Sequence, residues 1–185
     1  MPDPPSAPEQ IPESEQPPDA ELPLPSFDDD DVEAGARMIA SENPHKSQEV
    51  HIEQVWTQIR EAQRHHQSLY QRITGGAGYG SQGGKRPVST AQPANDAQRQ
   101  LVREILQGQH PSVLPMARKW FEPGQQDAAF QIAERARAKQ AQGEPLTAQE
   151  TRLLKYHYDA DGIRQKWTGE GAQMVESVDG LEFYT

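Results

Sequence analysis

The sequence contains no cysteine, which excludes disulfide bonds, thiolate metal sites and cysteine nucleophiles. Aromatic residues make up only 6% of the chain and hydrophobic residues 34%, and the mean hydropathy is −0.92. No stretch approaches the roughly 18 consecutive apolar residues that a membrane helix needs. The N-terminus also lacks the basic opening and the apolar run of a secretory signal. We therefore expect a soluble, cytoplasmic protein with one small core and no membrane association.

The negative charge of the chain is concentrated at its N-terminal end. The net charge is −10, but residues 1–50 hold thirteen acidic and two basic residues, whereas residues 51–185 hold fifteen acidic and sixteen basic ones. Residues 1–49 also carry most of the prolines and few apolar side chains. Such a segment buries too little apolar surface to offset the entropy lost on ordering. We predict that residues 1–49 form a disordered, acidic, proline-rich tail.

Within this tail, a short apolar group stands just before an acidic run. It could be a linear motif that docks on a protein partner, with the acidic residues drawing it to a basic surface. The alternative is that the tail only keeps the protein in solution. The residues of this candidate motif are Leu22, Leu24, Phe27, Asp28, Asp29, Asp30 and Asp31.

Residues 50–74 show the clearest periodicity in the chain. Apolar positions recur at alternating intervals of three and four, which predicts one helix with a narrow stripe like the seam of a coiled coil. The stripe spans about three heptads, which is marginal for an isolated coiled coil. We expect it either to form a weak homo-oligomer or to pack on the C-terminal part. Its positions are Ile52, Val55, Ile59, Ala62, His66, Leu69 and Ile73.

Residues 75–94 are rich in glycine and have no periodicity, which predicts a flexible linker. A helical module should follow over residues 95–185. Its first helix is expected to start at a cap on Asn95 or Asp96 and to end at Gly108. A short element over residues 115–121 should bring Trp120 and Phe121 to the core, and another helix is predicted over residues 125–142.

The last part of the module carries two strong local signals. Thr147 and Glu150 form a T-x-x-E capping box, which predicts the start of a helix that we extend to about Thr168. Further on, Asp179 and Gly180 separate two short apolar stretches, as in a β-hairpin with a two-residue turn. The fold class is therefore mainly α, with a disordered tail, a seam helix, a linker and a small helical bundle that ends in a hairpin.

Motifs for catalysis or for cofactors are not supported. The glycine-rich stretch around Gly84 lacks the glycine and the Ser or Thr of a phosphate-binding loop, since Tyr79 and Arg86 stand at those positions. An EF-hand-like stretch near Asp159 places Thr168 where the closing Glu should be. The six histidines show no H-x-x-x-H spacing. We expect no enzyme activity, no metal and no cofactor.

Basic residues next to aromatic ones provide a second functional hypothesis. Such clusters can neutralise phosphates and stack on bases, although acidic residues share the same helices. In this alternative, the acidic tail competes for the basic surface as an internal phosphate mimic. The candidate nucleic-acid contacts are Arg118, Lys119, Arg135, Lys139, Arg152, Lys155, Arg164 and Lys166. The favoured hypothesis is a non-catalytic adaptor that binds a protein partner through its helical module and its tail.

Overall fold

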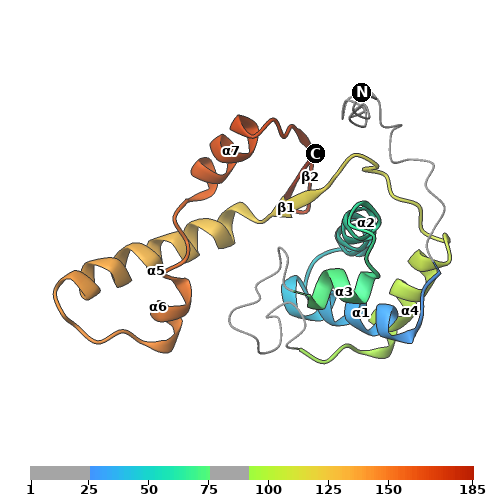
Figure 1. Ribbon diagram of the computed structural model, residues 1–185, viewed down its shortest axis with the longest axis horizontal. Coiled ribbons are helices and arrows are strands. Elements are labelled where there is room, and N and C mark those ends of the chain that lie inside the picture. The colour runs from blue at the N-terminus through green and yellow to red at the C-terminus, as the bar shows by residue number, and fades with distance from the viewer. Residues whose placement is uncertain (1–25, 76–91) are drawn as a thin grey trace, which may run out of the picture.

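The computed structural model describes residues 26–75 and 92–185, and in these ranges the chain is mainly helical with one small antiparallel sheet (Figure 1). The helices are α1 (Asp29–Glu42), α2 (Gln48–Arg64), α3 (Leu69–Thr74), α4 (Asp96–Leu106), α5 (Pro123–Ala141), α6 (Ala148–Leu153) and α7 (Ala160–Gly169). The strands are β1 (Lys119–Phe121), β2 (Met174–Val178) and β3 (Leu181–Tyr184). Leu22, Leu24 and most of the predicted glycine-rich linker lie outside the described residues.

Helix α1 corrects the predicted extent of the tail, because it lies inside residues 1–49. Asp28 caps the helix: the Asp31 amide donates to Asp28 Oδ1 at 3.0 Å, and the Asp28 amide donates to Asp31 Oδ2 at 3.2 Å. Carboxylates in a first turn also interact favourably with the helix dipole. Behind this cap, α1 buries Val32, Ala36, Met38 and Ile39. The acidic run is thus the start of a packed helix.

The predicted single helix over residues 50–74 is also wrong. Helix α2 ends at Arg64, and the chain turns through His66, whose φ of +53° lies in the left-handed region. Ser68 then caps α3 together with Gln71. The helix therefore ends at this turn, and the side chains of Ser68 and Gln71 accept hydrogen bonds from amides at the start of α3.

The predicted oligomer seam is buried within the chain itself. Val55, Ile59, Leu69 and Ile73 lie in a core formed with α1 and α4, with Ala62 buried nearby and Ile52 packed against that core. His66, the remaining seam position, is exposed. Helix α4 belongs to the predicted C-terminal module, so the stripe packs in part on the C-terminal part, as the second expectation had it. It also packs on α1, which was not predicted.

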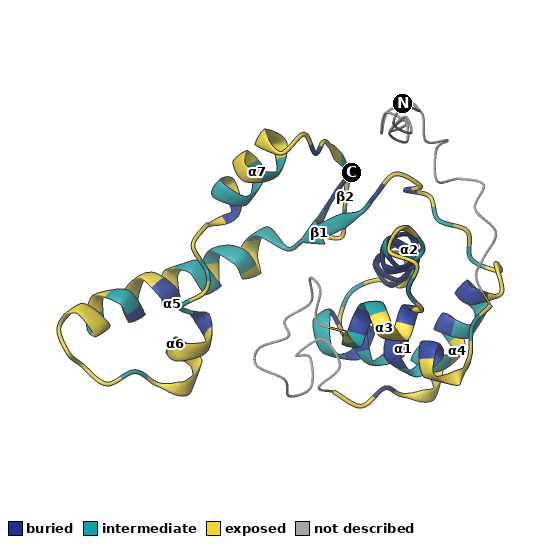
Figure 2. Cartoon of the chain, viewed as in Figure 1, coloured by how far each residue is buried: buried dark blue, intermediate teal, exposed yellow. Residues whose placement is uncertain are grey.

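Helix α2 lies between two cores and is buried on most of its surface (Figure 2). One side faces the core shared with α1, α3 and α4. On the other side, Val50 joins Leu114, Ala117, Leu181 and Phe183 in a second core beneath the sheet. Since α4 packs on α1 and α2, the predicted module of residues 95–185 is not a separate unit. The last residues of the predicted linker are packed too, as Gln92 N donates to Ser41 Oγ at 2.9 Å.

The sheet has the strand order β1-β3-β2 and is antiparallel throughout. The predicted hairpin is confirmed: Asp179 and Gly180 have φ of +47° and +80°, as a two-residue type I′ turn requires. The third strand was not predicted. Trp120 and Phe121 lie on β1, where Trp120 pairs with Phe183 and Phe121 with Glu182.

Helices α5, α6 and α7 form an arm that extends from the sheet (Figure 1). The capping box of Thr147 and Glu150 is present as predicted. The single helix predicted from there to Thr168 is not, because Asp159 accepts a hydrogen bond from the Gly162 amide at 2.8 Å and begins α7 as a new helix.

A buried ion pair on α2 holds the segment that leads from α4 to β1. Glu53 accepts hydrogen bonds from Ser112 Oγ and from the Val113 amide, each at 2.7 Å. Arg60 donates to the Ala117 carbonyl at 2.6 Å and lies 3.8 Å from Glu53. Both charged side chains are at least 95% buried. Helix α2 thereby determines where β1 starts.

We predict that Ile59→Ala lowers the free energy of unfolding by about 3 kcal/mol, because it leaves a cavity in the core. Chemical denaturation at two protein concentrations would measure the change, with the exposed Val113→Ala as the control. The midpoint should not depend on protein concentration. A midpoint that rises with concentration would instead support the coiled-coil seam.

We predict that Glu53→Gln costs about 3 kcal/mol of stability, since it removes the carboxylate charge that lies 3.8 Å from the buried Arg60 guanidinium. Glu49→Gln removes the same charge from an exposed position on the same helix and should cost under about 1 kcal/mol. Thermal unfolding of the two variants tests the difference. Equal stabilities would show that the ion pair does not hold the segment.

Candidate functional site

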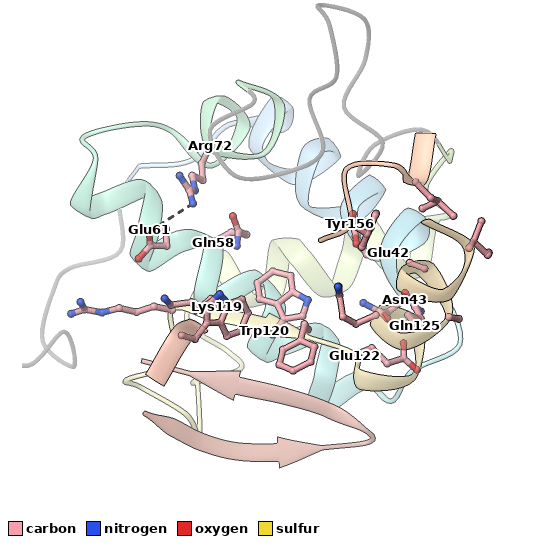
Figure 3. Close-up of a pocket in the computed structure, with 18 of the residues that line it drawn as sticks. Glu42, Asn43, Gln58, Glu61, Arg72, Lys119, Trp120, Glu122, Gln125 and Tyr156 are labelled. Atoms are coloured by element: carbon pink, nitrogen blue, oxygen red, sulfur yellow. Dashed lines mark ion pairs between the residues drawn. The ribbon is translucent and has the colours of Figure 1, made fainter. Parts of the chain in front are cut away.

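A cleft of about 670 Å³ lies between the helical core and the arm (Figure 3). This volume is within the range of pockets that bind small molecules or short segments of a chain. Its two walls differ in chemistry. The arm, the sheet and the residues next to them supply the apolar and aromatic side chains, which include Trp120, Phe121, Ile132, Leu153, Tyr156 and Trp167, and they also supply polar ones, which include Lys119, Glu122, Gln125, Gln126 and Gln149. The first three helices supply polar ones, which include Glu42, Asn43, Gln58, Glu61 and Arg72.

The aromatic wall is held in place by ring contacts between α7 and the sheet. Trp167 meets Phe121 edge to face at a centroid distance of 5.2 Å, and it meets Tyr184 in the same way at 5.1 Å. Such pairs contribute about 0.5–1.5 kcal/mol each beyond the area they bury. Trp167 is therefore fixed in position while remaining half-buried at the edge of the cleft.

A charged network reinforces the same contact. Arg164 on α7 donates to Glu182 on β3, with Nε–Oε2 at 3.0 Å and Nη2–Oε1 at 2.6 Å. The Tyr184 hydroxyl donates to Glu182 Oε2 at 2.8 Å. The hydrogen bonds from Arg164 lower the pKa of Glu182, while burial and the neighbouring carboxylate raise the pKa of Tyr184 to about 12. This network ties α7 to the middle strand of the sheet.

Tyr156 is positioned by the loop between α6 and α7, which is tied to α5. Arg137 on α5 donates to the carbonyls of Leu154, at 3.1 Å, and of Tyr156. The Ala160 amide donates to Asp127 Oδ1 at 2.7 Å. These bonds hold the loop along α5 and place Tyr156 on the wall of the cleft.

The charged residues that line the cleft include both paired and incompletely paired ones. Arg72 and Glu61 form an ion pair at 3.7 Å, drawn in Figure 3. Glu122 Oε1 lies 3.1 Å from Lys46, but its other oxygen, Oε2, is buried and has no hydrogen-bond partner among the residues that the structure describes. Glu122 Oε2 could therefore accept a further hydrogen bond.

Glu42 is the least compensated acid of the cleft. It is the last residue of α1, where the helix dipole disfavours a negative charge, and the last turn has no basic residue. Burial raises its pKa, and the charge of Lys155 only partly opposes this. Within residues 26–75 and 92–185, no hydrogen bond or ion pair joins the Glu42 carboxylate to another side chain.

The residues of the predicted docking motif fall into two groups, those outside the described residues and those at the start of α1. Leu22 and Leu24 are outside the described residues, whereas Phe27 packs against the core. Asp31 is buried and accepts a hydrogen bond from the Tyr70 amide at 2.7 Å, and Asp29 lies 3.4 Å from Arg103. Asp30 is exposed. Phe27, Asp28 and Asp31 therefore have structural roles at the start of α1, and the docking of this segment on a partner stays a prediction.

The candidate nucleic-acid contacts do not gather into one unpaired basic face. Lys119 and Lys166 both lie 3.9 Å from Glu170, and Lys139 lies 2.7 Å from Glu150. Arg164 belongs to the network with Glu182, and Arg118 lines the cleft. The remaining three, Arg135, Arg152 and Lys155, are exposed on the arm.

Sequence reasoning missed the cleft residues Glu42, Gln58, Glu61, Glu122 and Tyr156. A local signal existed only for Glu42, as an acid at the C-terminal end of a helix, and it could be used only once α1 was recognised. Across the described ranges, no group of three His, Asp or Glu side chains is placed to hold a metal ion.

Comparisons with known proteins do not identify a relative: no protein-family model matches the chain, and no similar curated protein or solved structure was found. Within the described part of the chain, every helix is too short or too polar to cross a membrane. The cleft is therefore the feature of the described structure that points to a function.

We predict that Glu182→Gln lowers the pKa of Tyr184 from about 12 toward its ordinary value of 10. Because an unfolded Tyr loses its proton first, the wild type should lose stability as the pH rises from 10 to 12, and the variant should lose less over that window. Tyrosinate absorbance and unfolding experiments would measure both effects. Tyr184→Phe is the control and should abolish the highest titration. An unchanged titration in Glu182→Gln would contradict the network.

Proposed function

We propose that the protein is a non-catalytic interaction protein whose cleft binds an extended peptide segment of a protein partner. The observation that carries the proposal is the cleft of about 670 Å³ with an aromatic wall on one side and a polar wall on the other. An extended chain presents side chains on opposite faces in alternation, so it can contact both walls at once. The polar wall also offers groups for the hydrogen bonds of its backbone.

Several half-buried aromatic residues support this function. Trp120, Tyr156 and Trp167 line the cleft and retain exposed surface. Tryptophan and tyrosine are prominent among the residues that dominate the binding energy of protein interfaces. Their positions are set by the sheet, by the network of Arg164 and by the bonds of Arg137, so little ordering is needed when a peptide binds.

The nucleic-acid alternative receives less support. Four of its eight candidate residues are engaged in ion pairs with acids of the same chain, namely Lys119, Lys139, Arg164 and Lys166. A phosphate would have to compete with those acids. The proposed competition by the acidic tail, the recruiting role of that tail and weak self-association all stay predictions.

The proposal is tested by selecting binding peptides from a displayed random library with the full chain as the target. Ala128→Trp places a large ring in the cleft, whereas Ala138→Trp makes the same change on the same helix outside it. Binding of the selected peptides should fall by about tenfold or more in Ala128→Trp, because a filled pocket excludes its ligand. The Ala138→Trp variant should bind as the wild type does.

The proposal fails if selection yields no binding peptide, or if the selected peptides bind Ala128→Trp as well as they bind the wild type. Binding to mixed-sequence DNA or RNA at low salt, measured in parallel, would support the alternative function, since contacts with phosphates are strongest there.

A further inference from the structure

The residues that precede the described range have a composition that suits the cleft. Residues 1–25 hold nine of the 16 prolines of the chain, together with six acidic residues and no basic one. Proline fixes its own φ and favours the extended polyproline II conformation. Prolines and acids are also interleaved, because an acidic residue directly follows each of Pro2, Pro8, Pro12 and Pro18.

The aromatic wall is the kind of surface on which proline-rich segments dock. Several interaction domains bind polyproline II helices in grooves lined by aromatic rings. Trp120, Tyr156 and Trp167 line the cleft and are half-buried, so each ring keeps some exposed surface (Figure 3). A polyproline II backbone makes no internal hydrogen bonds, so its carbonyls need donors from the protein. The same cleft offers amide side chains as donors, which include Asn43, Gln125 and Gln149.

Two rings of the wall have a lysine beside them. Lys119 Nζ lies 5.1 Å from the centroid of the Trp167 ring, and Lys155 Nζ lies 5.7 Å from that of Tyr156. A proline packed on either ring would bring the acid that follows it close to a lysine. Lys119 also lies 3.9 Å from Glu170, but exposed ion pairs contribute little, so another acid can replace this one. The basic and acidic side chains that line the cleft are equal in number: Arg72, Arg118, Lys119, Glu42, Glu61 and Glu122.

The prolines of the segment can reach the cleft within one chain. Helix α1 has 14 residues and is therefore about 21 Å long. The segment precedes the start of α1, whereas Glu42, at the end of this helix, lines the cleft. At about 3.1 Å per residue, about seven residues of polyproline II cover that length. Residues 19–25 suffice for this path, which leaves residues 1–18, with seven of the nine prolines, for contacts in the cleft.

We infer that residues 1–18 of the same chain bind in the cleft as a proline-rich segment, an inference that rests on the proposed peptide-binding function. The prolines pack on the aromatic wall, and the acids between them approach Lys119 and Lys155. A tethered segment has an effective concentration on the order of millimolar, so weak contacts are enough to keep it bound for much of the time. A peptide of a partner then has to displace this segment before it binds.

A nitroxide label on the full chain tests this contact directly. Because the sequence has no cysteine, Ser14→Cys provides a single position for the label. The label should abolish the NMR signals of the indole N–H groups of Trp120 and Trp167. The indole of Trp56 donates to the His110 carbonyl at 2.7 Å and does not line the cleft, so its signal should remain as an internal control. Equal intensities for the three indole signals would overturn the inference.

Substitutions in the segment test the role of its prolines. Alanine in place of Pro8, Pro12 and Pro17 should restore the two lost signals at least in part, because it removes rings that pack on the wall. Ser6→Ala together with Gln10→Ala is the control and should leave the signals lost. If the proline variant behaves as the control does, the assignment to a proline-rich segment is wrong.

Competition links the segment to the binding of a partner. A peptide selected as described above should restore the signals of both cleft tryptophans when it is added to the labelled chain. It should also bind the proline variant about threefold or more tighter than the wild type, since the tethered competitor is weakened. Equal affinities would show that the segment does not occupy the same site.

The outcomes separate this inference from the proposed function. If selected peptides are excluded by Ala128→Trp but the label leaves all three indole signals unchanged, this inference alone is overturned. If no peptide is selected and no signal is lost, both fail. Selective loss of signals in a protein that selects no peptide would support the inference and overturn the partner. Loss of signals in isotope-enriched, unlabelled chains mixed with labelled chains would identify the occupant as the segment of a second copy, and would overturn binding within one chain.

Discussion

The buried pair of Glu53 and Arg60 is the constraint on which the remaining structure depends. Both charges lie within α2, and each is used to hold the segment that crosses from α4 to β1. Buried charges tolerate little displacement, because a shifted partner leaves a desolvated charge behind. The position of β1 follows from this pair, and with it the position of the sheet, of α7 and of the aromatic wall. The position of the cleft thus depends on the contacts that Glu53 and Arg60 of α2 make with the segment before β1.

Local signals in the sequence predicted local structure well. The caps at Asn95 and Thr147 and the turn at Asp179 and Gly180 were all found, because each depends on hydrogen bonds or backbone angles a few residues apart. Two such signals were missed. The box of Asp28 and Asp31 was hidden by the acidic composition around it, and the break at His66 uses a left-handed residue that is not glycine.

The cleft could not be predicted in the same way. The cleft is lined by residues far apart in the sequence, such as Glu42 and Trp167. Their proximity depends on how the two cores pack on either side of α2. The apolar stripe on α2 was read correctly as a buried face, but the stripe alone does not say whether its partner is another chain or α1. Had α1 been predicted, its apolar face would have identified a partner for the stripe within the same chain.

The order of the strands determines when the cleft can exist. Strand β3 is the last of the described strands along the chain, yet it lies in the middle of the sheet between β1 and β2. During synthesis, α1 to α4 can assemble as soon as they leave the ribosome. Strand β1 cannot pair with β3 until residues 181–184 have been made. Until then the aromatic wall is not formed, so the helical core of a newly made chain can form well before the cleft does.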